Sequence, residues 1–166
     1  WTHLELQRVF GIEKLLSAET ARDIYEQCNK MLQQDEFGTR GLMQKFNVEV
    51  ICTTDDPCDS LMHHKQIKES DFDILVLPTW RPDKSLAVEE MSSFVEYIQK
   101  LEKAADTTIE NFNDYKKAVK SRHDYFHSAG CKLSDHGIEA FYSEDCSENE
   151  AEDIFKKIYI DKKDLT

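Results

Sequence analysis

Several common features are missing from this 166-residue sequence. No run approaches the roughly 18 apolar residues that a membrane-spanning helix needs, and the first residues do not read as a signal peptide. The five cysteines form no CxxC pair, so neither a zinc knuckle nor a redox motif is predicted. No GxGxxG follows a predicted strand, which removes the usual dinucleotide-binding fingerprint. We therefore expect reduced thiols and a cytoplasmic location.

Positive charge is also scarce, because 21 Lys and Arg residues stand against 33 Asp and Glu residues, for a net charge of −12. This balance argues against binding nucleic acid or an anionic membrane surface through bulk charge. A small anionic substrate stays compatible with it, because one nearby arginine can outweigh a distant negative field. An apolar content of 40% and an aromatic content of 10% are enough for a folded core. Because the chain begins at Trp1 without Met, we expect a fragment.

The hydrophobic pattern changes near residue 47. Residues 1–46 are predicted to be helical, with Ser17 capping a helix that extends through Leu32 and a short helix over residues 39–46. Beyond that point short β-branched runs alternate with helical ones, which predicts a βαβ series with parallel strands. The strands are expected at residues 48–53, 74–79 and 132–134, and the helices at residues 58–69, 88–105, 109–128 and 151–160.

Each predicted strand ends in a polar cluster, namely CTTDDP, TWRPDK or SDHG. The carboxyl ends of parallel strands meet at one edge of a sheet, where α/β enzymes build their sites. The Arg81 guanidinium can bind a carboxylate through two hydrogen bonds, or it can form a structural ion pair with Asp83. Asp135 and His136 can accept hydroxyl hydrogen bonds, relay a proton or ligate a metal, or Asp135 can simply bond its own turn.

Other polar residues are better explained by structural roles. Asp56, just before Pro57, is predicted to be a helix N-cap, while Asp55 could still point into a site. The pair His63 and His64 is expected on a solvated helix face, without a metal. His123 and His127 lie four residues apart, a spacing that zinc can use, but the glutamate of an HExxH motif is absent and a structural role is favoured.

The motifs, taken together, resemble uronate isomerase (glucuronate isomerase) of the amidohydrolase superfamily. The matching text is WTHLELQRVFGI, TARDIYEQCN, GLMQKFNVEVICTTDDPCDSL, LPTWRPDK and FHSAGCKLSDHG, in the order and approximate spacing of the family. The joint occurrence of CTTDDP, a T-aromatic-RPDK and GCKLSDHG makes the resemblance specific. Trp80 stands where Phe is expected more often.

This resemblance implies a fold and an activity. The fold is a partial (β/α)8 TIM-barrel segment, with residues 1–46 as the end of a helical insert and residues 47–166 as consecutive barrel units. The activity is aldose–ketose isomerisation of hexuronates, which interconverts glucuronate with fructuronate and galacturonate with tagaturonate. The implied substrate-binding residues are Arg81, Asp135 and His136, and no catalytic residue is assigned within this chain.

The resemblance also implies a divalent metal, zinc or manganese, in the whole isomerase, and a homo-oligomer. The family's metal-binding HxH and later barrel ligands do not occur in this sequence, so we expect no metal to be held by this chain alone and no activity from it in isolation. The rival interpretations are a non-catalytic α/β interaction module and a metal-dependent hydrolase of the same superfamily. If the strand ends form a substrate-recognition face, Arg81 and Asp135 must lie on the same sheet edge, within the span of one sugar.

Overall fold

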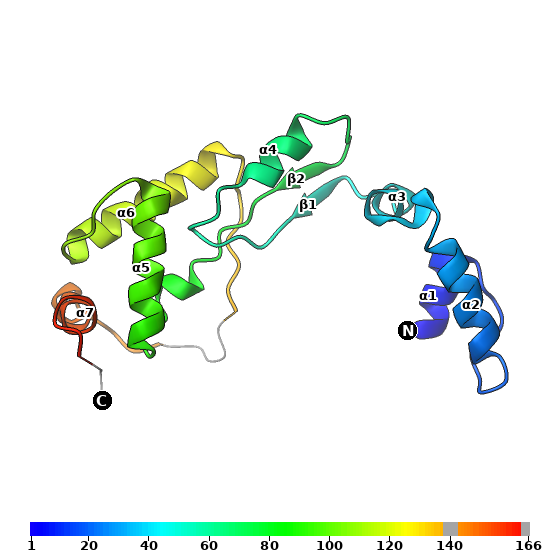
Figure 1. Ribbon diagram of the computed structural model, residues 1–166, viewed down its shortest axis with the longest axis horizontal. Helices are drawn as coiled ribbons and strands as arrows, with labels where there is room; N and C mark the ends of the chain where they lie inside the picture. Colours follow the sequence, from blue (N-terminus) through cyan, green and yellow to red (C-terminus); the bar gives the residue numbers. More distant parts are fainter. Residues whose placement is uncertain (138–142, 164–166) are drawn as a thin grey trace. The chain divides into compact units, whose positions relative to one another are not determined.

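The computed structural model describes residues 1–137 and 143–163 and divides into two compact units, Trp1–Val50 and Ile51–Thr166. In this described part the chain is a mostly helical α/β protein with two parallel strands, β1 and β2 (Figure 1). No helix in the same residues is long and apolar enough to cross a membrane.

The first unit is helical, as predicted. Its elements are α1 (Thr2–Phe10), α2 (Ala21–Met31), the 3-10 turn η1 (Asp35–Phe37) and α3 (Thr39–Lys45). Helix α1 is followed by the C-cap residue Gly11, whose backbone φ of 69° is in the left-handed region that glycine adopts without strain. The buried core of this unit joins Leu6, Ile12 and Ile24.

The prediction that Ser17 caps the second helix is wrong. The N-cap residue is Thr20, and the Ser17 hydroxyl instead donates to the Glu19 carboxylate at 2.6 Å. Thr20 Oγ1 accepts from the Ser17 N–H at 2.8 Å and donates to the Leu15 carbonyl at 2.7 Å. Since these bonds close the turn before the helix, α2 begins at Ala21.

The second unit carries the α/β pattern. Its elements are β1 (Val50–Cys52), which begins at the unit boundary, α4 (Met62–Lys68), β2 (Leu75–Leu77), the 3-10 turn η2 (Asp83–Ser85), α5 (Met91–Ala105), α6 (Phe112–Ser128), α7 (Glu148–Phe155) and the π-helical turn η3 (Lys156–Ile160). The predicted third strand is reduced to one parallel bridge between Trp80 and Ser134. The backbone around Ser134 pairs with the chain after β2 over too few residues to count as a strand.

The helix expected from residue 88 begins at Met91. Two other predicted helix starts are wrong for identifiable reasons. The helix expected from residue 109 begins at Phe112, because the buried Ile109 gives its N–H to the Glu102 carboxylate at 2.8 Å and Asn111 caps the helix. The last helix begins at Glu148 rather than near residue 151. There Ser147 and Glu150 form a reciprocal capping box, for which the Ser-x-x-Glu pattern was present in the sequence.

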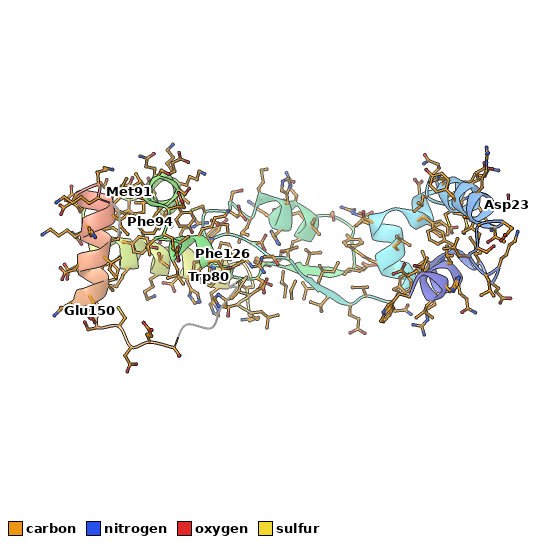
Figure 2. The ribbon with its side chains drawn as sticks, turned by 90° about the horizontal axis from the view of Figure 1, so that it is seen from below. Asp23, Trp80, Met91, Phe94, Phe126 and Glu150 are labelled. Carbon is orange, nitrogen blue, oxygen red and sulfur yellow. The ribbon has the colours of Figure 1, made fainter. Side chains whose placement is uncertain are left out.

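Two apolar clusters support this unit. The larger one packs α5 and α6 against α7 and η3, with Phe94, Ile98, Tyr115 and Phe155 among its members. The smaller one, Leu61, Trp80, Phe126 and Cys131, lies beneath the strand ends. The rings of Trp80 and Phe126 meet edge to face, with centroids 5.1 Å apart. Figure 2 labels both residues. Trp80 is therefore a core residue, and its packing fixes the backbone from which the Arg81 side chain extends.

The predicted C′ residue of α6 is confirmed. Gly130 follows the C-cap residue Ala129 and has a φ of 101°, which a side chain would strain. A Cβ atom at this position would also come within 3.1 Å of the Leu77 side chain. Glycine thus lets the chain leave α6 and return beside β2 toward Ser134.

Candidate functional site

The three polar clusters do meet at one edge. The Arg81 N–H donates to the Asp55 carbonyl at 3.0 Å, which continues the pairing of β1 with β2. On the other side, the Trp80 N–H donates to the Leu133 carbonyl and the Asp135 N–H donates to the Trp80 carbonyl, both at 3.0 Å. The chain after β2 therefore lies between the other two segments, and Arg81 and Asp135 stand on the same edge.

Two side chains, those of Arg81 and Thr54, converge on the Asp135 carboxylate. Nη2 of Arg81 lies 2.8 Å from Oδ2 of Asp135, and the Thr54 hydroxyl donates to that same oxygen at 3.2 Å. The Arg81 and Asp135 side chains are 38% and 40% exposed, so both are accessible to a ligand. With two donors on Oδ2, Asp135 can still accept hydrogen bonds from a ligand through Oδ1.

Asp83 lies on the other side of the Arg81 guanidinium. Its Oδ2 lies 3.4 Å from Nε of Arg81 and accepts the Gly137 N–H at 3.1 Å. Its Oδ1 lies 3.3 Å from Nδ1 of His136. His136 is thus connected to Arg81 through Asp83. The ion pair of Arg81 with Asp83 that the sequence allowed is present, together with the contact between Arg81 and Asp135.

Behind this edge, Asp55 is buried and belongs to a hydrogen-bond network. Its Oδ2 accepts from the Thr53 hydroxyl at 2.6 Å and from the Thr79 N–H at 3.2 Å. Nε2 of His64 lies 2.7 Å from Thr53 Oγ1 and 3.7 Å from Asp55 Oδ2. The predicted solvated face is therefore wrong for His64, whose side chain is only 13% exposed, because α4 packs it against the end of β1.

The helix after β1 also departs from the prediction, because it begins at Met62 and not near residue 58. Asp56 caps a turn rather than a helix, its Oδ1 accepting the Cys58 N–H at 2.9 Å. The carbonyl groups that would accept the first hydrogen bonds of an earlier helix accept from side chains instead. Arg122 donates to those of Pro57 and Asp59, both at 2.8 Å, and Tyr125 donates to that of Ser60 at 2.6 Å.

The same turn holds a thiol with altered acidity. Burial, followed by the negative charge of Asp56, raises the pKa of Cys58 from 9.0 to about 11. Burial likewise raises the pKa of Tyr115 to about 12 and raises that of Tyr97 further. Because the unfolded thiol ionises first, this group destabilises the folded state as the pH rises from about 9 to about 11.

We predict that Cys58 reacts slowly with iodoacetamide. At pH 8.5 its alkylation should be about 100-fold slower than that of an ordinary exposed thiol, because a pKa two units higher lowers the thiolate fraction by about that factor. Peptide mass spectrometry over time measures the rate, with exposed Cys52 and Cys146 as internal controls. Equal rates at all three thiols would contradict the shift.

His123 and His127 line a depression of about 310 Å³ together with Trp80, Cys131, Lys132, Leu133 and Ser134. The His123 ring meets Trp80 edge to face at 5.3 Å. Across residues 1–137 and 143–163, no three His, Cys, Asp or Glu side chains are grouped so that they could hold a metal ion.

The sequence does not single out two residues that contribute to the edge. Thr54 is one residue of the CTTDDP cluster, and Asp83 follows Arg81 as its possible ion-pair partner. The sequence feature that points to both residues is their position in the polar clusters that end the strands. Which side chains reach a neighbouring segment, however, depends on the register of the sheet.

Comparison with known proteins gives a consistent result. The family model described as glucuronate isomerase matches residues 1–166. The uronate isomerase of Bacteroides thetaiotaomicron is 54% identical over 159 residues, covering 96% of this chain and 34% of the relative. That of Cellvibrio japonicus is 46% identical over 160 residues, covering 95% of this chain and 34% of the relative. The chain therefore spans about a third of the length of these relatives.

Solved structures match over the same share. The crystal structure of uronate isomerase from Thermotoga maritima has a TM-score of 0.82 at 35% identity, covering 96% of this chain and 35% of that one. The crystal structure of glucuronate isomerase from Caulobacter crescentus has a TM-score of 0.84 at 30% identity, covering 95% of this chain and 33% of that one. The sequence comparisons and the structure comparisons thus match uronate isomerases alike.

Proposed function

Because the chain belongs to the glucuronate isomerase family, we propose that it forms the substrate-recognition edge of a uronate isomerase. The reaction is the aldose–ketose isomerisation of hexuronates, glucuronate to fructuronate and galacturonate to tagaturonate. The observation that carries the proposal is the 2.8 Å contact between Arg81 and Asp135 at neighbouring segment ends. Both side chains are part exposed and lie within the span of one sugar.

In this proposal the residues of the edge divide binding between them. Arg81 donates hydrogen bonds to carboxylate or hydroxyl oxygens of the sugar, since its planar guanidinium carries five N–H groups. Asp135 accepts from a hydroxyl through Oδ1 while Thr54 and Arg81 hold Oδ2. His136 supports the loop that carries Asp135, through its contact with Asp83. The chain binds and orients substrate, and no proton transfer is assigned to it.

A metal does not fit the described residues of this chain, because they bring no three ligands together. No step of the proposal is therefore routed through a metal. The zinc or manganese and the homo-oligomer that the resemblance implies belong to the whole isomerase and stay predictions. The five free thiols favour a reducing, cytoplasmic compartment as part of the proposal.

We assign the chain to a segment of a (β/α)8 barrel, with residues 1–46 as the end of a helical insert and residues 47–166 as consecutive barrel units. The parallel pairing of β1 with β2 and the parallel bridge at Ser134 support this assignment. So do the TM-scores with the two isomerase structures. A partial barrel explains why the polar segment ends share one edge.

The proposal is tested with a chimera in which residues 1–166 replace the matching segment of the Bacteroides thetaiotaomicron uronate isomerase. We expect the chimera to convert glucuronate to fructuronate, measured by coupled reduction of the ketose, and the 166-residue chain alone to show no turnover. The unaltered relative and the relative lacking this segment are the controls. A folded chimera without hexuronate turnover would contradict the proposed function.

A further inference from the structure

Asp83 connects the loop after β2 with His136 and Gly137. One carboxylate oxygen accepts the Gly137 N–H at 3.1 Å and lies 3.4 Å from Nε of Arg81, and the other lies 3.3 Å from Nδ1 of His136. Gly137 comes close enough that a Cβ atom there would lie 3.6 Å from Cζ of Arg81. A single carboxylate therefore forms an ion pair with the guanidinium and contacts His136 and Gly137 beside it.

Asp83 is itself held in place. It opens the 3-10 turn η2, in which the Ser85 N–H donates to the Pro82 carbonyl at 2.8 Å and the Leu86 N–H donates to the Asp83 carbonyl at 3.0 Å. Ser85 is buried, and the Tyr115 hydroxyl of α6 donates to its carbonyl. The turn is thus fixed to the helical core, and the Asp83 side chain, 24% exposed, projects from a rigid backbone.

The side of Arg81 that Asp83 occupies matters for ligand binding. Asp83 lies against Nε, an atom with no hydrogen-bonded acceptor among the described residues, while Nη2 faces Asp135. An arginine held only at its tip would sample several rotamers and would have to be ordered when the sugar binds. A carboxylate at Nε orients the planar group and leaves its outer N–H groups for the ligand.

We propose that Asp83 is a positioning residue for the sugar-binding Arg81, an inference that rests on the proposed function. It acts by keeping the guanidinium oriented toward Asp135 and by holding Gly137 beside it. It does not contact the substrate. Its loss is expected to weaken substrate binding through Arg81 while leaving the chemical step nearly unchanged.

The experiment measures KM and kcat of the chimera carrying Asp83→Asn, Arg81→Met or both. The asparagine oxygen can still accept the Gly137 N–H, so this change removes mainly the charge beside Arg81 and His136. We expect KM for glucuronate to rise about 10- to 100-fold with kcat within about threefold of the unsubstituted chimera. In the Arg81→Met background the further effect of Asp83→Asn should be less than about twofold, because the group it positions is absent.

Asp124→Asn is the matched control, since Asp124 is an exposed aspartate paired with Lys120 on α6. A purely structural role would lower the melting temperature and the active fraction, hence kcat, without raising KM. An Asp83→Asn variant that matches the control, or effects that multiply independently in the double variant, would overturn the inference while the proposed function stands. A folded, unsubstituted chimera that is inactive on hexuronates would instead refute the proposed function, and the inference with it.

Discussion

Replacing Arg122 with methionine is expected to lower the free energy of unfolding of the Ile51–Thr166 unit by about 3 kcal/mol, because three carbonyl groups lose their donor at about 1 kcal/mol each. Arg122 is 7% exposed, and its guanidinium donates to the carbonyls of Pro57, Asp59 and Ala104. It also lies over the Tyr125 ring, 4.2 Å from the centroid. A methionine fills much of the volume but satisfies none of these acceptors.

The loss is measured by urea unfolding followed through the fluorescence of Trp80, which packs against Phe126 in the same unit. Lys120→Met on the same helix is the matched control, because Lys120 is 74% exposed and forms an exposed ion pair with Asp124. That control should change stability by less than about 0.5 kcal/mol. Arg122→Lys should recover less than half of the loss, since one ammonium cannot reach three divergent carbonyls. Equal stability of Arg122→Met and Lys120→Met would contradict this role.

Replacing Arg81 with methionine in the chimera is expected to lower kcat/KM for glucuronate by about 100-fold or more. Two charge-assisted hydrogen bonds to the sugar at about 1.5 kcal/mol each account for that factor. The substitution also leaves the carboxylates of Asp83 and Asp135 without the positive charge between them, which disfavours an anionic substrate.

The conservative change separates charge from geometry. Arg81→Lys keeps the positive charge but cannot contact Asp83, Asp135 and a ligand with one planar group, so we expect a loss of at least about tenfold. Steady-state kinetics measure both variants, with Lys120→Met in the same chimera as the control. Kinetic constants for Arg81→Met that match those of the control would remove Arg81 from the recognition edge.

Local patterns predicted the elements that local contacts stabilise. The short helix α3 lies where the sequence after Gly38 placed it, and Gly130 ends α6 as expected because its φ of 101° suits glycine. The helix after β1 was predicted too early for a long-range reason. The carbonyls of residues 57, 59 and 60 are bound by Arg122 and Tyr125, which lie more than 60 positions further along the chain.

The sequence by itself determined that the chain is α/β and that polar clusters follow its strands, and it predicted one shared edge for them, since parallel strands bring their carboxyl ends together. The sequence also carried the motifs of the family. The structure decided that Arg81 and Asp135 meet there. Only the tertiary structure decided that Thr54 and Asp83 join them, that His64 is buried, and that Arg122 holds the turn after Asp56. These contacts join residues far apart in the chain, and their distances depend on register and packing, which no local pattern encodes.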